Sequence, residues 1–264
     1  MVQQLTEATS TIIYPDSDGQ PMADNTKQFR WIVVIKENLE ILFTNVADVF
    51  VAGDLLWYPV KGDNKIRQAP DIMVAFGRQK GDRGSYKQWE EANIPPQVVF
   101  EILSPGNRLK EMTKKLHFYE RYGVEEYYIY DPDRIDLVGL QRLGDHLEVI
   151  EEINGWVSPR LGIKFELNSD TLAIFSPSGE RFLTPVELDQ LRQQEQQRAD
   201  EAVAQLQQEQ QRADEAVAQL QQDQQFRQQE QQRADEAVAQ LQQEQQRYQA
   251  MLEQLRLRGI DPQL

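Results

Sequence analysis

The 264-residue sequence contains no cysteine and only two histidines. Without thiols the chain has no disulfide framework and no thiolate metal site, and His117 and His146 stand in no spacing typical of metal ligands. The sequence also has no apolar run near 18 residues and no charged-then-apolar leader, which argues against membrane spanning and export. These absences predict a cytoplasmic protein without a membrane partner.

Basic residues are scarce as well, with 28 Lys and Arg against 43 Asp and Glu, a net charge of -15. A surface this acidic argues against indiscriminate binding of nucleic acids. Basic residues outnumber acidic residues in two stretches, 61–87 and 105–121. These two basic islands are either ordinary solvated surface or a contact for a polyanion. In the second case, the expected phosphate or DNA contacts are Arg78, Lys80, Arg83, Arg108 and Lys110.

Three regions differ in composition and periodicity. Residues 1–24 are polar and predict a flexible N-terminal arm. Residues 25–183 mix helical and strand periods, which is typical of an α/β domain. Residues 184–264 predict a long helix. Within the middle region we expect helices at 25–46 and 108–122, a long loop at 77–96 with a short helix near 87–92, and strands at 48–57, 72–76, 98–103, 127–130, 135–140, 146–151, 162–167 and 171–175.

The long C-terminal helix begins with a capping signal and continues as a repeat. Thr184 can cap the helix, Pro185 suits its first position, and Glu187 completes a capping box. The sequence EQQRADEAVAQLQQ then occurs at 195–208, 209–222 and 230–243. The seven-residue insert between the last two copies preserves the heptad register.

One seam of this helix carries Val and Leu at two of every four core places, and Gln and Ala at the others. The seam predicts a coiled coil that self-associates through residues 190–258, and an isolated solvated helix is the alternative.

Two acids stand in strands where apolar residues are usual. Asp71 opens the apolar run 72–76, and Glu101 interrupts the run 98–103. A buried carboxylate is costly unless a cation or hydrogen-bond donors compensate it. If the two strands are neighbours, the acids form an oxygen site suited to Mg²⁺, with Mn²⁺ as a substitute. A metal ion there can activate water and stabilise charge on a phosphate.

The helix after Glu101 offers a third group, Lys115. At about 100° per residue, the spacing places Leu109, Met112, Leu116 and Tyr119 on the core face of the helix, with Lys115 at its edge. From there the ammonium could orient the attacking water or offset charge on a scissile phosphate.

Simpler interpretations of these residues stay open. Asp71 follows a proline and could cap backbone amides in a turn. Glu101 could pair with Arg108 or Lys115 as a buried ion pair. Lys115 could be a flank residue that covers apolar surface with its stem.

The strings PDIMVAF, FEILSPGNR and K-x-x-x-Y-x-x-x-GVEEYYIYDP together resemble the Uma-type putative restriction endonuclease family of the PD-(D/E)xK nuclease superfamily. The resemblance covers roughly residues 25–170. It implies a restriction-endonuclease-like core with a mixed central sheet flanked by helices, and Mg²⁺-dependent hydrolysis of phosphodiester bonds in DNA.

The resemblance also implies site residues. Asp71 matches the aspartate of the PD motif, and Glu101 matches the acid of the second motif. Leu103 stands where that motif has its lysine, and the family instead shows a helical lysine four residues before a tyrosine, here Lys115 and Tyr119.

Such sites often include an acid from the N-terminal helix, for which Glu37 and Glu40 are both candidates. Asp54 could support the site from the preceding strand. The displaced lysine keeps an alternative open, a catalytically inactive binding or scaffold protein on the nuclease fold.

Overall fold

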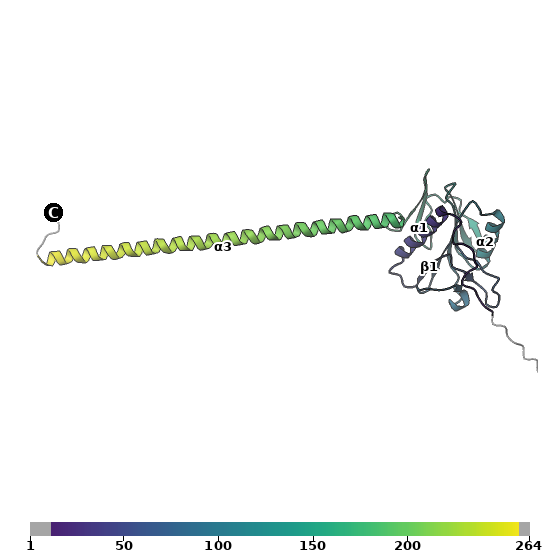
Figure 1. Ribbon diagram of the computed structural model, residues 1–264, viewed down its shortest axis with the longest axis horizontal. Coiled ribbons are helices and arrows are strands. Elements are labelled where there is room, and N and C mark those ends of the chain that lie inside the picture. The colour runs from purple at the N-terminus through teal and green to yellow at the C-terminus, as the bar shows by residue number, and fades with distance from the viewer. Residues whose placement is uncertain (1–11, 259–264) are drawn as a thin grey trace, which may run out of the picture. The chain divides into compact units, whose positions relative to one another are not determined.

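The computed structural model describes residues 12–258 and divides the chain into two compact units, one ending at Gln190 and one beginning at Leu191 (Figure 1). The helices are α1 (Thr26–Leu42), the 3-10 helix η1 (Gln88–Glu90), α2 (Leu109–Arg121) and α3 (Pro185–Leu257). The strands are β1 (Val49–Gly53), β2 (Trp57–Tyr58), β3 (Ile72–Phe76), β4 (Tyr86–Lys87), β5 (Val98–Ile102), β6 (Glu126–Asp131), β7 (Asp136–Leu143), β8 (His146–Val149), β9 (Lys164–Leu167) and β10 (Leu172–Phe175).

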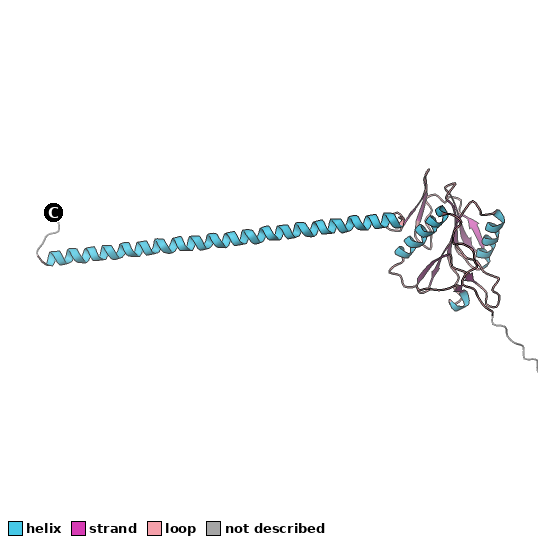
Figure 2. Ribbon diagram, in the orientation of Figure 1, coloured by secondary structure: helices cyan, strands magenta, loops and turns pink. Residues whose placement is uncertain are grey.

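A six-stranded sheet forms the centre of the first unit, in the order β1-β3-β5-β6-β7-β8. β5 and β6 run parallel, whereas the other neighbours in this sheet are antiparallel. The remaining strands form two small sheets, in which β9 pairs with β10 and β2 pairs with β4. Figure 2 shows the helices and strands of the chain in different colours. The predicted fold class, a mixed central sheet with helices and a long C-terminal helix, is confirmed.

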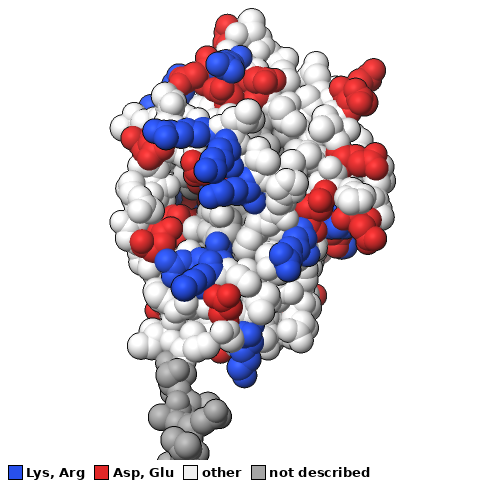
Figure 3. Space-filling model, turned by 90° about the vertical axis from the view of Figure 1, so that its right-hand side faces the viewer, with Lys and Arg blue, Asp and Glu red and all other residues white. Residues whose placement is uncertain are grey.

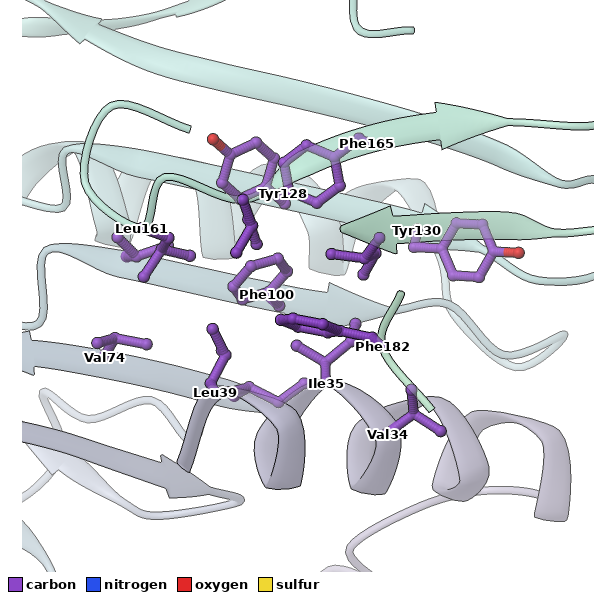
Figure 4. Packing of buried hydrophobic residues seen from close by; sticks show 14 of the residues in the cluster. Val34, Ile35, Leu39, Val74, Phe100, Tyr128, Tyr130, Leu161, Phe165 and Phe182 are labelled. Carbon is purple, nitrogen blue, oxygen red and sulfur yellow. The ribbon is translucent and has the colours of Figure 1, made fainter. Parts of the chain in front are cut away.

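The two faces of the sheet carry different layers. On one face, Ile35 and Leu39 of α1 pack with Phe100 of β5, Phe165 of β9 and the loop residue Phe182 (Figure 4). On the other face, apolar residues of β2, β4 and α2 pack together, among them Trp57, Tyr86 and Tyr119. Because side chains alternate along a strand, Phe100 points to the first layer and its neighbour Glu101 to the second.

Local signals set the ends of both flanking helices. The Asn25 side chain caps α1 by accepting hydrogen bonds from the backbone N–H groups of Lys27 and Gln28, both at 2.9 Å. Gly123 follows α2 with φ +93°, a conformation that a glycine adopts without strain. The core face predicted for α2 was partly wrong, because Leu109 in its first turn is 86% exposed.

Residues 12–24 contain no helix or strand, and residues 1–11 of the expected flexible arm lie outside the described residues. The described part is nevertheless packed on the domain. The Tyr14 ring contacts the rings of Tyr58 and Trp89, with centroids 5.2 and 4.9 Å away. The Tyr58 hydroxyl donates to the carbonyl of Pro15 at 2.7 Å. The segment therefore follows a defined path from Tyr14 to the start of α1.

α3 begins with the predicted capping box. The Glu187 carboxylate accepts from the Thr184 N–H at 2.8 Å, and the Thr184 hydroxyl accepts from the Glu187 N–H at 3.2 Å. Along the helix, Gln side chains donate to acids four residues later, as Gln196 does to Asp200, which supports a solvated helix. None of the described helices is long and apolar enough to cross a membrane.

Candidate active site

Three acids from neighbouring strands lie in one row of the sheet. Ile72 pairs with Gly53 on one side and with Phe100 on the other. One step along this register, Asp71 stands between Asp54 and Glu101, and the Asp54 N–H donates to the Asp71 carbonyl at 3.2 Å. The strands thus bring together the two acids that the sequence singled out, with Asp54 beside them.

Glu101 is 2% exposed and both of its carboxylate oxygens have partners. Lys115 Nζ lies 2.7 Å from Oε2, and the Tyr119 hydroxyl donates to Oε1 at 2.5 Å. Of the alternatives left open for Glu101, the ion pair with Lys115 is the one present. Although burial opposes it, the Glu101 charge raises the pKa of Lys115 and keeps the ammonium protonated.

The turn at 104–107 explains how Lys115 reaches back. Ser104 N–H donates to Asn107 Oδ1 at 2.6 Å, and this turn directs α2 back over the end of β5. Tyr119 follows Lys115 by four residues, so both side chains lie on the same face of α2. Because both side chains are buried, the packing of α2 fixes the positions of the two groups that bind Glu101.

Asp71 is 8% exposed, and its Oδ2 accepts from the Ile102 N–H at 2.6 Å. The backbone contact proposed as an alternative role for Asp71 is therefore present. Burial, together with the nearby charge of Glu101, raises the pKa of Asp71 to about 8. Burial, with a smaller contribution from Asp18, also raises the pKa of Asp54. Without a bound cation, Asp71 therefore keeps its proton near neutral pH.

A polar cavity of about 300 Å³ opens onto Asp71. Its charged lining residues are Asp18, Asp24, Asp54, Asp71, Glu111 and Lys115, and its amide residues include Gln20, Gln28, Gln68 and Asn107. Glu101 is not among the lining residues and lies beside Lys115. A ligand in this cavity would thus meet Asp71 and Lys115 before Glu101.

Sequence reasoning missed the α1 residue at this cavity, Gln28. Its amide Nε2 donates to the Ile102 carbonyl at 2.8 Å, and its Oε1 accepts from the Asp24 N–H at 2.8 Å. Gln28 is only 6% exposed, and no signal in the sequence marks it, because this burial becomes visible only in the folded structure. The expected helix acids lie elsewhere: Glu37 and Glu40 pair with Lys36 and do not line the cavity.

The basic residues expected to contact DNA fall into two groups. Arg78 and Arg83 both bind Glu91, with Nε to carboxylate distances of 2.8 and 2.6 Å. Lys80 donates to the Phe43 carbonyl at 2.5 Å. These three side chains therefore have partners within the protein that hold the loop 77–96, and their role as phosphate contacts stays a prediction.

Arg108 and Lys110 form the second group, and both are exposed at the start of α2. Figure 3 shows the side of the first unit that lies to the right in Figure 1, where α2 is labelled. Lys and Arg side chains there are interspersed with Asp and Glu. The basic side chains on this side thus form no face of one charge.

The chemistry of the oxygen atoms at the cavity suits a hard divalent cation. Mg²⁺ commonly binds one or two carboxylates and keeps several water molecules. The described residues contain no ready group of three or more acids, histidines or cysteines arranged to hold a metal ion. A metal site built on Asp71 and Glu101 would therefore rely on water for the remaining ligands.

Comparisons with known proteins identify one matching family. The family model "Uma2: Putative restriction endonuclease" matches residues 13–173, more than half of the chain. Among solved structures, the chain is similar to a "putative nuclease belonging to DUF820" from Anabaena variabilis ATCC 29413, at 18% identity and a TM-score of 0.39, covering 51% of this chain and 72% of that one. The search of curated proteins found no match.

Proposed function

Because this chain belongs to the Uma2 family, we propose that it is a nuclease that hydrolyses phosphodiester bonds of DNA with the help of Mg²⁺, which Mn²⁺ can replace. The observation that carries the proposal is the pair of buried acids, Asp71 and Glu101, beside the buried Lys115. A protein gains nothing in stability from Asp71 and Glu101 placed side by side away from water. A cation bound at the cavity would offset the charge of both carboxylates and allow Asp71 to ionise.

In this proposal Asp71 and Glu101 hold the metal ion, which activates water and stabilises charge on the phosphate when bound. Lys115 lies between Glu101 and the cavity. Its ammonium is placed to orient the attacking water or to offset charge on the scissile phosphate. Tyr119 fixes the orientation of the Glu101 carboxylate, and Asp54 supports Asp71 from the neighbouring strand.

Nicking of supercoiled plasmid tests the proposal. The full chain should nick DNA with Mg²⁺ or Mn²⁺ and not with EDTA. Asp71→Asn and Glu101→Gln should each reduce the rate at least about a hundredfold, since each removes a charged metal ligand. Asp145→Asn is the matched control, because it makes the same charge change at an exposed turn. Full activity in either site variant would rule out these roles.

The alternative function, a catalytically inactive binding or scaffold protein, also has an observation in its favour. Lys115 and Tyr119 already satisfy both oxygens of Glu101, and Leu103 stands where related motifs have a lysine. Calorimetry with Mg²⁺ separates the two functions. If the protein is a nuclease, the titration should show a heat of Mg²⁺ binding that is lost in Asp71→Asn. If the protein gives no heat of Mg²⁺ binding, the result supports the scaffold function.

We also propose that the chain self-associates through residues 190–258. In the single chain, the apolar seam of α3 is exposed to solvent, including Val203, Leu206, Val217, Leu220, Val238 and Leu241. Pairing of these positions between copies would remove them from water.

A further inference from the structure

The segment 12–24 lies beside the candidate active site, because several of its residues line the cavity that opens onto Asp71. At its start, Asn64 donates to the Ile13 carbonyl at 2.8 Å, and the Tyr14 hydroxyl accepts from the Gly62 N–H at 2.6 Å. At its end, the Ser104 hydroxyl donates to Asp24 at 2.5 Å, next to the start of α1. We use the name strap for residues 12–24, because they are fastened at both ends.

Between these two attachments the strap forms one wall of the cavity that opens onto Asp71. Asp18, Gln20, Pro21, Met22, Ala23 and Asp24 are all lining residues. Asp71 and Lys115 line the same cavity and are 8% and 9% exposed. The strap is therefore part of what keeps the reactive groups away from solvent.

The wall has the wrong charge for a phosphate substrate. Asp18 and Asp24 line the cavity on the strap, and Glu111 adds a third acid from α2. Lys115 is the one cation among the described lining residues, and Glu101 already binds it. Duplex DNA carries one negative charge about every 1.7 Å of its axis, so a phosphate approaching Asp71 meets carboxylates first.

The size of the cavity leads to the same conclusion. About 300 Å³ holds an ion with its water molecules or a small group, but it does not admit a rigid duplex whose major groove alone is about 12 Å wide. A metal ion can enter with the strap in place. To bring its backbone to Asp71, a duplex would have to displace the strap residues that line the cavity.

From this geometry we propose that the strap is an autoinhibitory cover, which must lift from the loops at 58–64 and 84–85 before DNA reaches the site. This inference rests on the proposed nuclease function for its choice of ligand. The resting protein is closed to DNA and open to small cations. Binding of DNA replaces the acidic wall with the phosphate backbone.

The chain offers a clean way to lock the strap, because it contains no cysteine of its own. A Cβ built on Gly84 would lie 2.4 Å from Asp16 Cγ, so cysteines at the two positions lie within disulfide reach. The double variant Asp16→Cys/Gly84→Cys should therefore form a reducible link between strap and loop. The single variant Gly84→Cys, treated identically, is the control.

The main readout is the affinity for a labelled DNA duplex in Ca²⁺, measured by fluorescence anisotropy before and after reduction. The oxidised double variant should bind DNA at least about tenfold more weakly than the reduced form, a difference near 1.4 kcal/mol. Mn²⁺ should bind equally to both forms. Equal DNA affinity in the two forms overturns the strap inference, whether or not the protein cuts DNA.

Cleavage is scored separately, so the two ideas can fail independently. Plasmid nicking that is absent in every form counts against the nuclease function, while a redox-dependent DNA affinity still supports the strap. As a second test, Asp18→Asn keeps the hydrogen bond that Asp18 accepts from the Gln20 N–H and removes one charge. It should raise DNA affinity several-fold, whereas Asp145→Asn should not, and equal effects of the two changes overturn the electrostatic part.

Discussion

Lys115 and Glu101 form a buried ion pair on the second face of the sheet. A buried pair contributes little net stability, because desolvation offsets most of the attraction. Breaking it by removing one partner is costly, since the other charge stays buried. The pair is therefore a sensitive probe of how the site is built.

Lys115→Met should destabilise the folded protein by about 3–5 kcal/mol, because Glu101 loses its cation while Tyr119 remains. The midpoint of urea unfolding measures the effect. Lys110→Met, on the exposed side of the same helix, should change stability by less than about 0.5 kcal/mol. Adding Glu101→Gln to Lys115→Met should recover much of the loss, and a double variant no better than the single one would contradict the pairing.

Asp71 should make the metal-free protein less stable as the pH rises. Its pKa is about 8 in the folded state against an ordinary 3.8, so the folded protein retains a proton that the unfolded chain has released. Stability should therefore fall from about pH 4 to about pH 8 and level off above that.

Asp71→Asn removes this titration and keeps an acceptor for the Ile102 N–H. Urea midpoints are measured in EDTA at pH values from about 5 to about 8.5. As the pH rises over this range, the stability of Asp71→Asn relative to the parent should increase. Asp145→Asn should show the same dependence of stability on pH as the parent. A parallel pH dependence in Asp71→Asn and the parent would show that Asp71 is ionised throughout.

At this scale the sequence identified Asp71, Glu101 and Lys115, because charged residues in apolar strands or at the edge of a core face break a pattern. Gln28 broke no pattern, since an uncharged amide fits an amphipathic helix. Glu37 and Glu40 were considered only because the family resemblance suggested an acid on that helix. Which turn of α1 faces the end of β5 depends on tertiary packing.

The loop 77–96 shows what the first basic island does in the fold. Glu91 joins Arg78 and Arg83 in one cluster, and the Arg83 guanidinium also lies over the Phe50 ring at 4.0 Å. Both arginines hold the Glu91 carboxylate in its charged form and, against the effect of burial, lower its pKa. The cluster closes a loop that has little regular structure of its own.

Glu91→Ala should loosen this loop by leaving both arginines without their shared partner. We expect a loss of about 1–3 kcal/mol in unfolding free energy and faster trypsin cleavage after Arg78 and Arg83. Glu90→Ala is the matched control, because Glu90 is 61% exposed at its side chain and lies 3.8 Å from Lys87. Unchanged proteolysis in Glu91→Ala would mean that the cluster does not order the loop.

Element boundaries were predictable where local chemistry sets them. The capping box of Thr184 and Glu187, the stop at Gly123 and the strand Ile72–Phe76 were all predicted from short-range signals. The exposure of Leu109 was not predictable. Helical spacing indicates which side of a helix faces the core, but not how far along the helix the sheet extends. The strand predicted at 48–57 likewise divides after Gly53, where Asp54 takes a positive φ.

At the scale of the whole molecule, the charges beside the seam of α3 oppose the assembly that its apolar residues favour. In the heptad register of Val203 and Leu206, Glu209 is a g position and Asp214 the following e position. A parallel pair in register places these two acids opposite each other between copies. The same holds for Glu195 with Asp200 and for Glu230 with Asp235.

Self-association through α3 should therefore strengthen as salt is added, the reverse of a coil held by ion pairs. Sedimentation equilibrium of the full chain at low and high NaCl measures this. Changing Leu206, Leu220 and Leu241 to Gln should abolish association, whereas changing Ala204, Ala218 and Ala239 to Gln should not. A mass that is independent of salt and of both sets of changes would rule out the seam.

The acids that meet at the ends of β1, β3 and β5 also affect how this protein responds to selection. Replacing Asp71 or Asp54 by a neutral residue of similar shape would relieve crowded charge without leaving a hole. Natural proteins are often less stable than they could be because functional sites carry unfavourable interactions. Selection for stability alone therefore favours substitutions that remove such interactions. A library sorted only for thermal resistance should thus enrich changes in this row, and so mark the proposed active site without any assay of activity.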